Sequence, residues 1–256
     1  MAYDYSGILI VSDVDETLTY YESKMSDENV KAVDYFTKNG GLFTLATGRP
    51  PLYPFKLYSP PLTINAPLCA IGGAAIISHT EEHEVLWDCP MEGNYAEIID
   101  RVYRKYRNLL NRNILINRFY DQQDVGDDFV FEDIPYYKLS IRTNEPKEAE
   151  IIVDDLKKHY GDQYYLCRSW DTGIEVTNIK ARKSVGVEKI KEMTGAKIAI
   201  GIGNYENDIA LLEGADIAVA VDNAIPELKK IADYTVAHCQ DHALKDLIEK
   251  IPHWLG

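Results

Sequence analysis

The hydrophobic residues of this chain gather in short, unbroken runs near its two ends. The clearest runs are ILIV at 8–11, LFTLAT at 42–47, IAIGIG at 198–203 and IAVAV at 217–221. An unbroken apolar run of this length is typical of a strand buried on both faces, as in a parallel sheet. We therefore expect parallel strands at these positions, with a further strand in DYTVA at 233–237.

Segments of helical periodicity separate these runs. Ser26 can cap a helix, because its side-chain oxygen can accept a hydrogen bond from the first free N–H groups. Val30, Val33 and Phe36 then lie on one helical face, and the Asn-Gly-Gly sequence at 39–41 ends the helix. Further helices are expected at 183–195, 207–214, 224–232 and 241–251. Such alternation of strands and helices predicts an α/β fold with a Rossmann-like, doubly wound parallel sheet.

The middle of the chain has a different pattern. A helix with apolar residues at 98, 102, 106 and 109 precedes strand-like segments at 113–120 and 136–143, a helix at 146–160, and strand-like segments at 163–170 and 173–178. This α-β-β-α-β-β order is typical of an antiparallel sheet with helices on one face. We therefore expect an inserted α+β cap domain at 83–180, which divides a core formed by 1–82 and 181–256. The segment 121–133 holds six acidic residues and no basic one, which favours a solvated loop.

Composition narrows the functional classes. The 256 residues carry 41 acidic and 27 basic side chains, a formal net charge of −14, which argues against non-specific binding to nucleic acid or membranes. No apolar run is long enough to span a bilayer, and the first residues do not resemble a secretory signal. The four cysteines are far apart in sequence, so reduced thiols in a cytoplasmic protein are expected.

Chemically reactive residues follow the predicted core strands. They are Asp13-x-Asp15-x-Thr17, Thr47-Gly48-Arg49 and Gly203-Asn204-x-x-Asn207-Asp208, with Lys183 at the start of a core helix. In an open α/β sheet, ligands bind beyond the carboxyl ends of the strands. Carboxylate oxygens suit Mg²⁺, whereas a hydroxyl group and an ammonium group suit phosphate. An aspartate can attack phosphorus, and a second carboxylate can transfer the protons.

These motifs, in this order, resemble those of the haloacid dehalogenase superfamily of phosphohydrolases. The α-β-β-α-β-β insert between the second and third motifs resembles the C2B-like cap of the Cof-type subfamily. The resemblance covers essentially the whole chain. It implies a Mg²⁺-dependent phosphatase that acts on a small phosphorylated metabolite, such as a sugar phosphate, through an aspartyl-phosphate intermediate.

The same resemblance assigns roles to individual residues. It implies that Asp13 is the nucleophile and that Asp15 is the general acid and base. The implied phosphate-binding residues are Val14, through its backbone N–H, with Thr47, Gly48 and Lys183. The implied metal-binding residues are Asp13, Asp15, Asn204, Asn207 and Asp208.

Three features depart from the family pattern, and two further points stay open. Asn204 stands where the family usually has a metal-binding aspartate, and Glu16 stands where glycine is most frequent. The turn at 71–74 reads IGGA, whereas relatives usually have Asn-Gly in it. Lys180 is an alternative to Lys183, and Arg49 is compatible with a substrate contact or with a structural ion pair.

Other functions fit less well. A calcium loop starting at Asp13 would need glycine and glutamate where Leu18 and Lys24 stand. The segment GIGNYE at 201–206 lacks the third glycine of a dinucleotide-binding loop. Two alternatives keep the fold: a weakened relative that only binds a phosphorylated ligand, which Asn204 favours, and a phosphotransferase or mutase. Neither the individual substrate nor the oligomeric state follows from these motifs.

Overall fold

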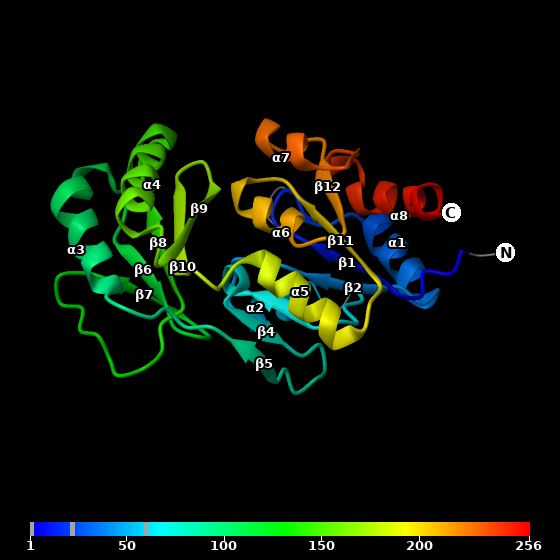
Figure 1. The fold of residues 1–256 in the computed structure, drawn as a ribbon, viewed down its shortest axis with the longest axis horizontal. Coiled ribbons are helices and arrows are strands. Elements are labelled where there is room, and N and C mark those ends of the chain that lie inside the picture. Colours follow the sequence, from blue (N-terminus) through cyan, green and yellow to red (C-terminus); the bar gives the residue numbers. More distant parts are fainter. Residues whose placement is uncertain (1–2, 21–23, 59–60) are drawn as a thin grey trace.

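The computed structural model describes residues 3–20, 24–58 and 61–256 of the chain. Its core is a parallel sheet with the strand order β13-β12-β11-β1-β2 (Figure 1). The strands are β1 (Ile8–Ser12), β2 (Leu42–Leu45), β11 (Ile198–Gly203), β12 (Ile217–Val221) and β13 (Tyr234–Val236). The predicted parallel sheet is therefore confirmed, and the first apolar run lies near its centre.

Helices cover this sheet. The helices of the core are α1 (Asp27–Lys38), α2 (Leu52–Tyr58), α5 (Lys183–Thr194), α6 (Ile209–Glu213), α7 (Pro226–Ile231) and α8 (Ala243–Leu255). The expected cap of α1 is present, because the Ser26 side chain accepts a hydrogen bond from the Asn29 N–H at 3.2 Å. Helix α1 packs against α8, whereas α5 packs against α6. Their apolar faces and the sheet form one large cluster of buried residues.

A small antiparallel sheet adjoins the core. It contains β3 (Leu68–Ala70), β4 (Ala75–Ile77) and β5 (Val85–Asp88), and the short 3-10 helix η1 (Ile71–Gly73) connects its first two strands. Strand β5 pairs with β4, and Cys89, which follows it, is buried in the core cluster. The cap boundary at residue 83 stays a prediction, but the pairing of β5 with β4 favours a later start of the cap, after Pro90. The apolar run of β5 is only three residues long, so the sequence did not signal a core strand there.

The cap contains a second antiparallel sheet, with the strand order β7-β6-β8-β10-β9. Its elements are α3 (Tyr95–Tyr106), η2 (Arg107–Leu109), β6 (Ile114–Asn117), β7 (Gln122–Val125), β8 (Lys138–Arg142), α4 (Pro146–Tyr160), β9 (Tyr164–Trp170) and β10 (Gly173–Asn178). Strand β7 was not expected, since it lies within the acidic segment 121–133. It is a polar strand at the sheet edge, and Val125 is its single buried residue.

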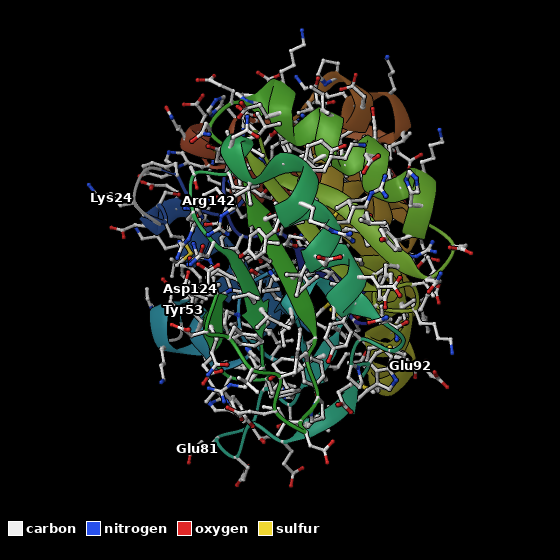
Figure 2. The ribbon with its side chains drawn as sticks, turned by 90° about the vertical axis from the view of Figure 1, so that its left-hand side faces the viewer. Lys24, Tyr53, Glu81, Glu92, Asp124 and Arg142 are labelled. Carbon is white, nitrogen blue, oxygen red and sulfur yellow. The ribbon has the colours of Figure 1, made fainter. Side chains whose placement is uncertain are left out.

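The two faces of the cap sheet differ in chemistry. Leu139 and Ile141 of β8 pack with residues of α3 and α4 in a second cluster of buried residues. The alternate residues of the same strand, Lys138, Ser140 and Arg142, line a cavity on the side of the core. Figure 2 looks onto the cap, with its helices in front of the sheet, and shows Arg142 on the same side of the molecule as Tyr53 of the core. The polar face of the cap therefore lies over the core.

Within residues 3–20, 24–58 and 61–256, no helix is both long enough and apolar enough to cross a bilayer.

Candidate active site

The candidate residues gather at the carboxyl ends of neighbouring strands. Asp13 follows β1, Thr47 follows β2 after one residue, and Asn204 follows β11. Because β1 lies between β11 and β2, these three strands present their ends at one place on the sheet edge. Lys183 is the first residue of α5. The topology thus brings the four predicted motifs to one edge of the sheet.

Lys183 joins the first motif to the last. Its Nζ donates hydrogen bonds to Asp13 Oδ1 and to Asp208 Oδ1, each at 2.6 Å. Its side chain is buried, as is that of Asp208. Burial alone would lower the pKa of Lys183, but the two carboxylates more than offset this and raise it above its usual value. The rival Lys180 is exposed, so the structure favours Lys183 for the predicted role.

Asp13 lies among more negative charge than Lys183 compensates. Burial of its carboxyl group, followed by the charge of Asp208, raises the pKa of Asp13 to about 7, although Lys183 acts in the opposite direction. The side chain of Asp13 is still slightly exposed, at 10%. Additional positive charge close to Asp13 would therefore favour its ionised, nucleophilic form.

The turn after β11 holds Asp208 in place. Asp208 Oδ2 accepts hydrogen bonds from the backbone N–H groups of Asn204, at 2.9 Å, and Tyr205, at 3.1 Å. The 3-10 helix η3 (Glu206–Asp208) carries the side chain back to the strand end. A Cβ atom at Gly203 would lie 2.5 Å from Asp208 Cβ, so this close approach requires glycine.

Several oxygen atoms that suit a hard cation lie around Asp13. Asn204 is buried, and its Oδ1 accepts a hydrogen bond from Thr17 Oγ1 at 3.2 Å. Asn207 lies half-buried in the same turn as Asp208. Across the described ranges, no group of three or more His, Cys, Asp or Glu side chains is arranged to hold a metal ion. Two carboxylates, completed by amide and carbonyl oxygens, nevertheless fit the preference of Mg²⁺ for oxygen.

The loop after β2 faces the cap. Thr47 is buried, and its Oγ1 accepts a hydrogen bond from the Arg49 N–H at 3.2 Å. The carbonyl oxygen of Gly48 accepts a hydrogen bond at 2.7 Å from Lys138 Nζ of the cap. Lys138 also forms a buried ion pair with Glu175, at 2.5 Å. A contact between cap and core is thus built beside a predicted phosphate-binding residue.

Asp15 has different neighbours from Asp13. Its carboxylate forms two hydrogen bonds with Arg49, from Nε at 3.0 Å and from Nη2 at 2.5 Å. Its side chain is 56% exposed, and the Arg49 guanidinium also lies over the Tyr53 ring, 4.6 Å from its centroid. The structure therefore gives Arg49 the ion pair that the sequence left open, and it places Asp15 at the entrance of the site.

Two backbone features shape the loop after β1. The Val14 carbonyl accepts hydrogen bonds from the N–H groups of Leu18, at 3.1 Å, and Thr19, at 2.9 Å. Glu16 has φ of 58°, in the left-handed region where glycine is favoured. This conformation accounts for the frequency of glycine at that position in the family that the motifs resemble. The predicted role of the Val14 N–H stays a prediction.

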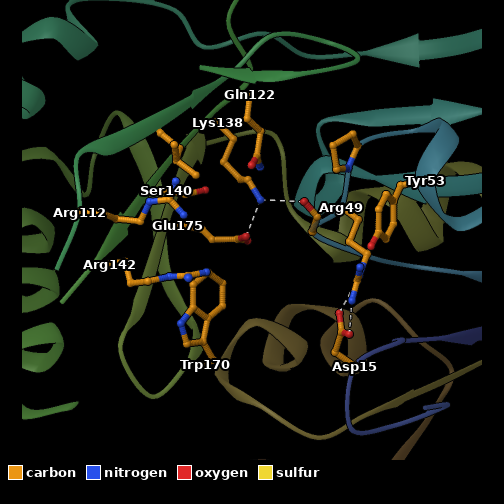
Figure 3. Close-up of a pocket in the computed structure, with 13 residues that line it drawn as sticks. Asp15, Arg49, Tyr53, Arg112, Gln122, Lys138, Ser140, Arg142, Trp170 and Glu175 are labelled. Carbon is orange, nitrogen blue, oxygen red and sulfur yellow. Dashed lines mark hydrogen bonds and ion pairs between the residues drawn. The ribbon is translucent and has the colours of Figure 1, made fainter. Parts of the chain in front are cut away.

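A cavity of about 610 Å³ lies between the core and the cap. Figure 3 shows Asp15, Arg49 and Tyr53 of the core on one side, facing Lys138, Arg142 and other cap residues on the opposite side. The motifs did not identify the cap residues that line it. The alternation of polar and apolar residues in KLSIR, at 138–142, was a signal that one face of this strand is polar, but it did not indicate what the face covers.

Comparisons with known proteins settle the family. The chain matches the profile of haloacid dehalogenase-like hydrolases over residues 10–248. It belongs to this hydrolase family. It is 26% identical over 266 residues to 5-amino-6-(5-phospho-D-ribitylamino)uracil phosphatase YcsE of Bacillus subtilis, a match that covers 96% of this chain and 95% of the relative.

Solved structures agree on the fold. A haloacid dehalogenase-like hydrolase from B. subtilis has a TM-score of 0.81 at 17% identity, covering 95% of this chain and 99% of the other. A sugar phosphatase of haloacid dehalogenase subclass IIB has a TM-score of 0.78 at 16% identity, covering 95% and 98%. The expected core and cap architecture of this hydrolase family is thereby confirmed, and members of the family generally use a divalent metal.

Proposed function

We propose that this enzyme is a Mg²⁺-dependent phosphatase that cleaves monoesters of small phosphorylated metabolites, such as sugar phosphates. The observation that carries the proposal is the pair of 2.6 Å contacts from Lys183 to Asp13 and Asp208. These contacts gather a buried carboxylate, a buried cation and a second carboxylate where an α/β sheet binds its ligands. The phosphatase activity named for the B. subtilis relative supports the same class of substrate.

Binding of the phosphoryl group would use groups on both sides of Asp13. We assign its oxygens to the Thr47 hydroxyl, the Lys183 ammonium and the backbone N–H groups of Val14 and Gly48. Charged and polar donors of this kind bind phosphate through short, strong hydrogen bonds. Lys183 would keep its contact with Asp13 and so hold the nucleophile and the phosphoryl group together.

The chemistry would proceed in two displacements. A carboxylate oxygen of Asp13 attacks phosphorus, the bond from phosphorus to the ester oxygen breaks, and that oxygen takes a proton from Asp15. A water molecule then attacks phosphorus of the aspartyl phosphate and gives a proton to Asp15. The bond from phosphorus to Asp13 breaks, so phosphate leaves and both carboxyl groups return to their first state. Before the first displacement Asp15 must leave Arg49 and take up a proton from solvent, and we expect Arg49 to turn toward the phosphoryl oxygens.

The oxygen donors described above would hold the metal ion. They are the carboxylates of Asp13 and Asp208, the side-chain oxygens of Asn204 and Asn207, and the backbone carbonyl of Asp15. Bound Mg²⁺ supplies positive charge that stabilises the ionised nucleophile and the phosphoryl oxygens. Asn204 contributes a neutral oxygen where a carboxylate is usual. This residue is the observation that favours the second candidate function, binding of a phosphorylated ligand without turnover.

The decisive test is release of phosphate from p-nitrophenyl phosphate by the wild type and by Asp13→Asn. We expect Mg²⁺-dependent release by the wild type, its loss in EDTA, and a decrease of about 10³-fold or more in the variant. Asp133→Asn, an exposed change in the cap, is the matched control. Retention of most of the activity in Asp13→Asn would disprove the assigned nucleophile.

The second candidate function makes a different prediction in the same experiment. A protein that only binds its ligand would release no phosphate at any Mg²⁺ concentration, but calorimetry would detect binding of inorganic phosphate. Suppression of phosphate release by added sugars, with formation of a new ester, would instead indicate phosphotransfer. A cytoplasmic location also stays a prediction.

A further inference from the structure

The cap side of the cavity carries positive charge that the proposed chemistry does not use. Arg112, Lys138 and Arg142 line the cavity from the cap, together with Ser140. Lys138, Ser140 and Arg142 alternate along β8 and so share the face that is turned to the core. The chain as a whole has a net charge of −14, so the gathering of basic side chains in this cavity contrasts with its acidic composition.

The ion pairs divide these cations into two groups. Arg49 is paired with Asp15, and Lys138 is paired with Glu175. Among the described residues, Arg112 forms an ion pair with Asp124 alone, at 3.7 Å, and the two side chains are 40% and 58% exposed to solvent. No carboxylate of the described chain forms an ion pair with Arg142. The positive charge of Arg112 is therefore only weakly compensated, and that of Arg142 is not compensated by an ion pair within the described residues.

The Arg142 side chain is held in a defined orientation. Its guanidinium lies over the Trp170 ring, 5.1 Å from the centroid. Trp170 lines the same cavity, as Figure 3 shows. Stacking on an aromatic face leaves the edge of a guanidinium group, with its N–H donors, free to bind an anion. The hydroxyl group of Ser140, two residues along the same strand, adds a neutral donor between Arg142 and Lys138.

We propose that Arg142, Arg112 and Ser140 form a subsite for a second anionic group of the substrate, at the end opposite the phosphoryl group that is cleaved. A carboxylate and a second phosphoryl group share the required chemistry, since arginine binds both through paired hydrogen bonds. The proposal rests on the proposed function, because it assumes that a phosphate monoester occupies the cavity with its reacting end at Asp13. It makes these cap residues determinants of specificity.

The test compares esters that differ only at the remote end. Suitable probes are 4-hydroxybutyl phosphate, which has a neutral end, 4-phosphooxybutanoate, which ends in a carboxylate, and butane-1,4-diol bisphosphate. Their flexible chains let the remote group reach the cap. We expect wild-type kcat/KM to be about tenfold or more higher for at least one of the anionic esters than for the neutral ester. The ester that is preferred identifies the kind of anionic group.

Arg142→Gln and Arg112→Gln test the residues themselves. We expect each to reduce the ratio of kcat/KM for anionic over neutral ester by about tenfold, mainly through KM. Arg107→Gln is the matched control, because Arg107 lies on η2 of the cap and stacks on Tyr103 outside the cavity. It should leave the ratio unchanged. Equal kcat/KM for all three esters, or an unchanged ratio in both cavity variants, would overturn the proposal.

Binding separates this proposal from the proposed function. Calorimetry with Asp13→Asn measures affinity for the same esters without turnover, so it remains informative if the wild type proves inactive. Tighter binding of an anionic ester that is lost in Asp13→Asn/Arg142→Gln supports the subsite even then. Hydrolysis of all three esters with no preference would instead support the phosphatase function and refute only the proposed subsite.

Discussion

At the scale of single residues, the separate environments of Asp13 and Asp15 fit the two chemical roles that we propose for them. Asp13 is buried against Lys183, whereas Asp15 is half-exposed and is held by Arg49. A buried carboxylate beside a lysine suits a nucleophile, because its orientation is fixed and little water competes with it. An exposed carboxylate at the entrance suits exchange of protons with leaving groups and water.

We predict that Asp15→Asn slows the hydrolysis of esters with poor leaving groups most. A side-chain amide is far too weak an acid to protonate the leaving oxygen, and protonation matters little for p-nitrophenolate but greatly for an alkoxide. We expect a loss of kcat of about 10²-fold or more for an alkyl phosphate and a smaller loss for p-nitrophenyl phosphate. Steady-state kinetics with both substrates checks this. An equal loss for the two substrates would count against the acid role.

Asn204 offers a second prediction at this scale. Asn204→Asp would place a third carboxylate close to Asp13 and Asp208, which already repel each other. Without metal, we expect the melting temperature to fall by about 2–4 °C per kcal/mol of added repulsion. With Mg²⁺, the new charge should increase metal affinity by about tenfold.

Thermal melts in EDTA and across a Mg²⁺ series measure both effects. Asn108→Asp is the control, because it adds the same charge at an exposed position of the cap. An Asn204→Asp protein whose Mg²⁺ affinity is unchanged would show that residue 204 does not face the metal.

The sequence identified most of the motif residues but not their contacts. The order of the motifs and the parallel strands were sufficient to predict that Asp13, Thr47 and Asp208 approach one edge of the sheet. The choice between Lys180 and Lys183 depended on where α5 begins, which periodicity defines only to within a turn. The Asp15–Arg49 pair joins residues from two different loops, so no local pattern contained it.

At the scale of the elements, the cap strands β8 and β10 meet the loop after β2. Lys138 and Glu175 are buried, and both lie against Gly48, whose carbonyl oxygen accepts a hydrogen bond from Lys138 Nζ. A Cβ atom at Gly48 would lie 2.9 Å from Glu175 Oε1, so a side chain there would push against a buried carboxylate. This contact aligns the cap sheet with the loop that carries Thr47.

We predict that Gly48→Ala displaces the cap and raises KM by about tenfold, with little loss of stability. Gly126→Ala is the control in the cap, because its nearest neighbour would be 3.4 Å away. Combination with Glu175→Asp, which shortens the opposing side chain, should lower KM part of the way back to the wild-type value. Kinetics of the single and double variants measure this coupling. No recovery in the double variant would mean that Gly48→Ala damages phosphate binding directly.

Strands β5 and β7, which the sequence pattern did not predict, share a physical cause. Both are short and lie at sheet edges, and each buries at most one of its residues. The apolar run of β5 is only three residues long and β7 has none, so pairing with a neighbouring strand rather than burial of their own side chains makes them strands. By contrast, β1 and β11 are buried along nearly their whole length, and their unbroken apolar runs were sufficient to predict them.

At the scale of the whole molecule, two separate clusters of buried residues correspond to the core and the cap. The crossing segments lie side by side, since Asn178 Nδ2 donates a hydrogen bond to the Pro90 carbonyl at 2.8 Å. Several polar contacts join the two parts. They include the Arg168–Glu206 ion pair and the hydrogen bonds from Tyr205 to Asp171 and from Tyr137 to Asp88.

The position of β5 in the core leads to the last prediction. We expect that replacing residues 91–178 by a short Gly/Ser linker leaves a folded core, because the two ends already meet and the core keeps its own cluster. Removal of 83–179 should be worse tolerated. It deletes β5 with its pairing to β4, and it also removes the buried Cys89, which leaves the core residues around it uncovered.

Circular dichroism, thermal melts and p-nitrophenyl phosphate kinetics compare the two shortened proteins with the full chain. The 91–178 deletion should melt cooperatively and cleave p-nitrophenyl phosphate. It should also lose discrimination among larger esters, because the cap side of the cavity is gone. The 83–179 deletion should melt at a lower temperature or aggregate, because β4 becomes an unprotected sheet edge. If the 91–178 deletion failed to fold while the 83–179 deletion folded, β5 would belong to the cap, and the boundary at Pro90 would be wrong.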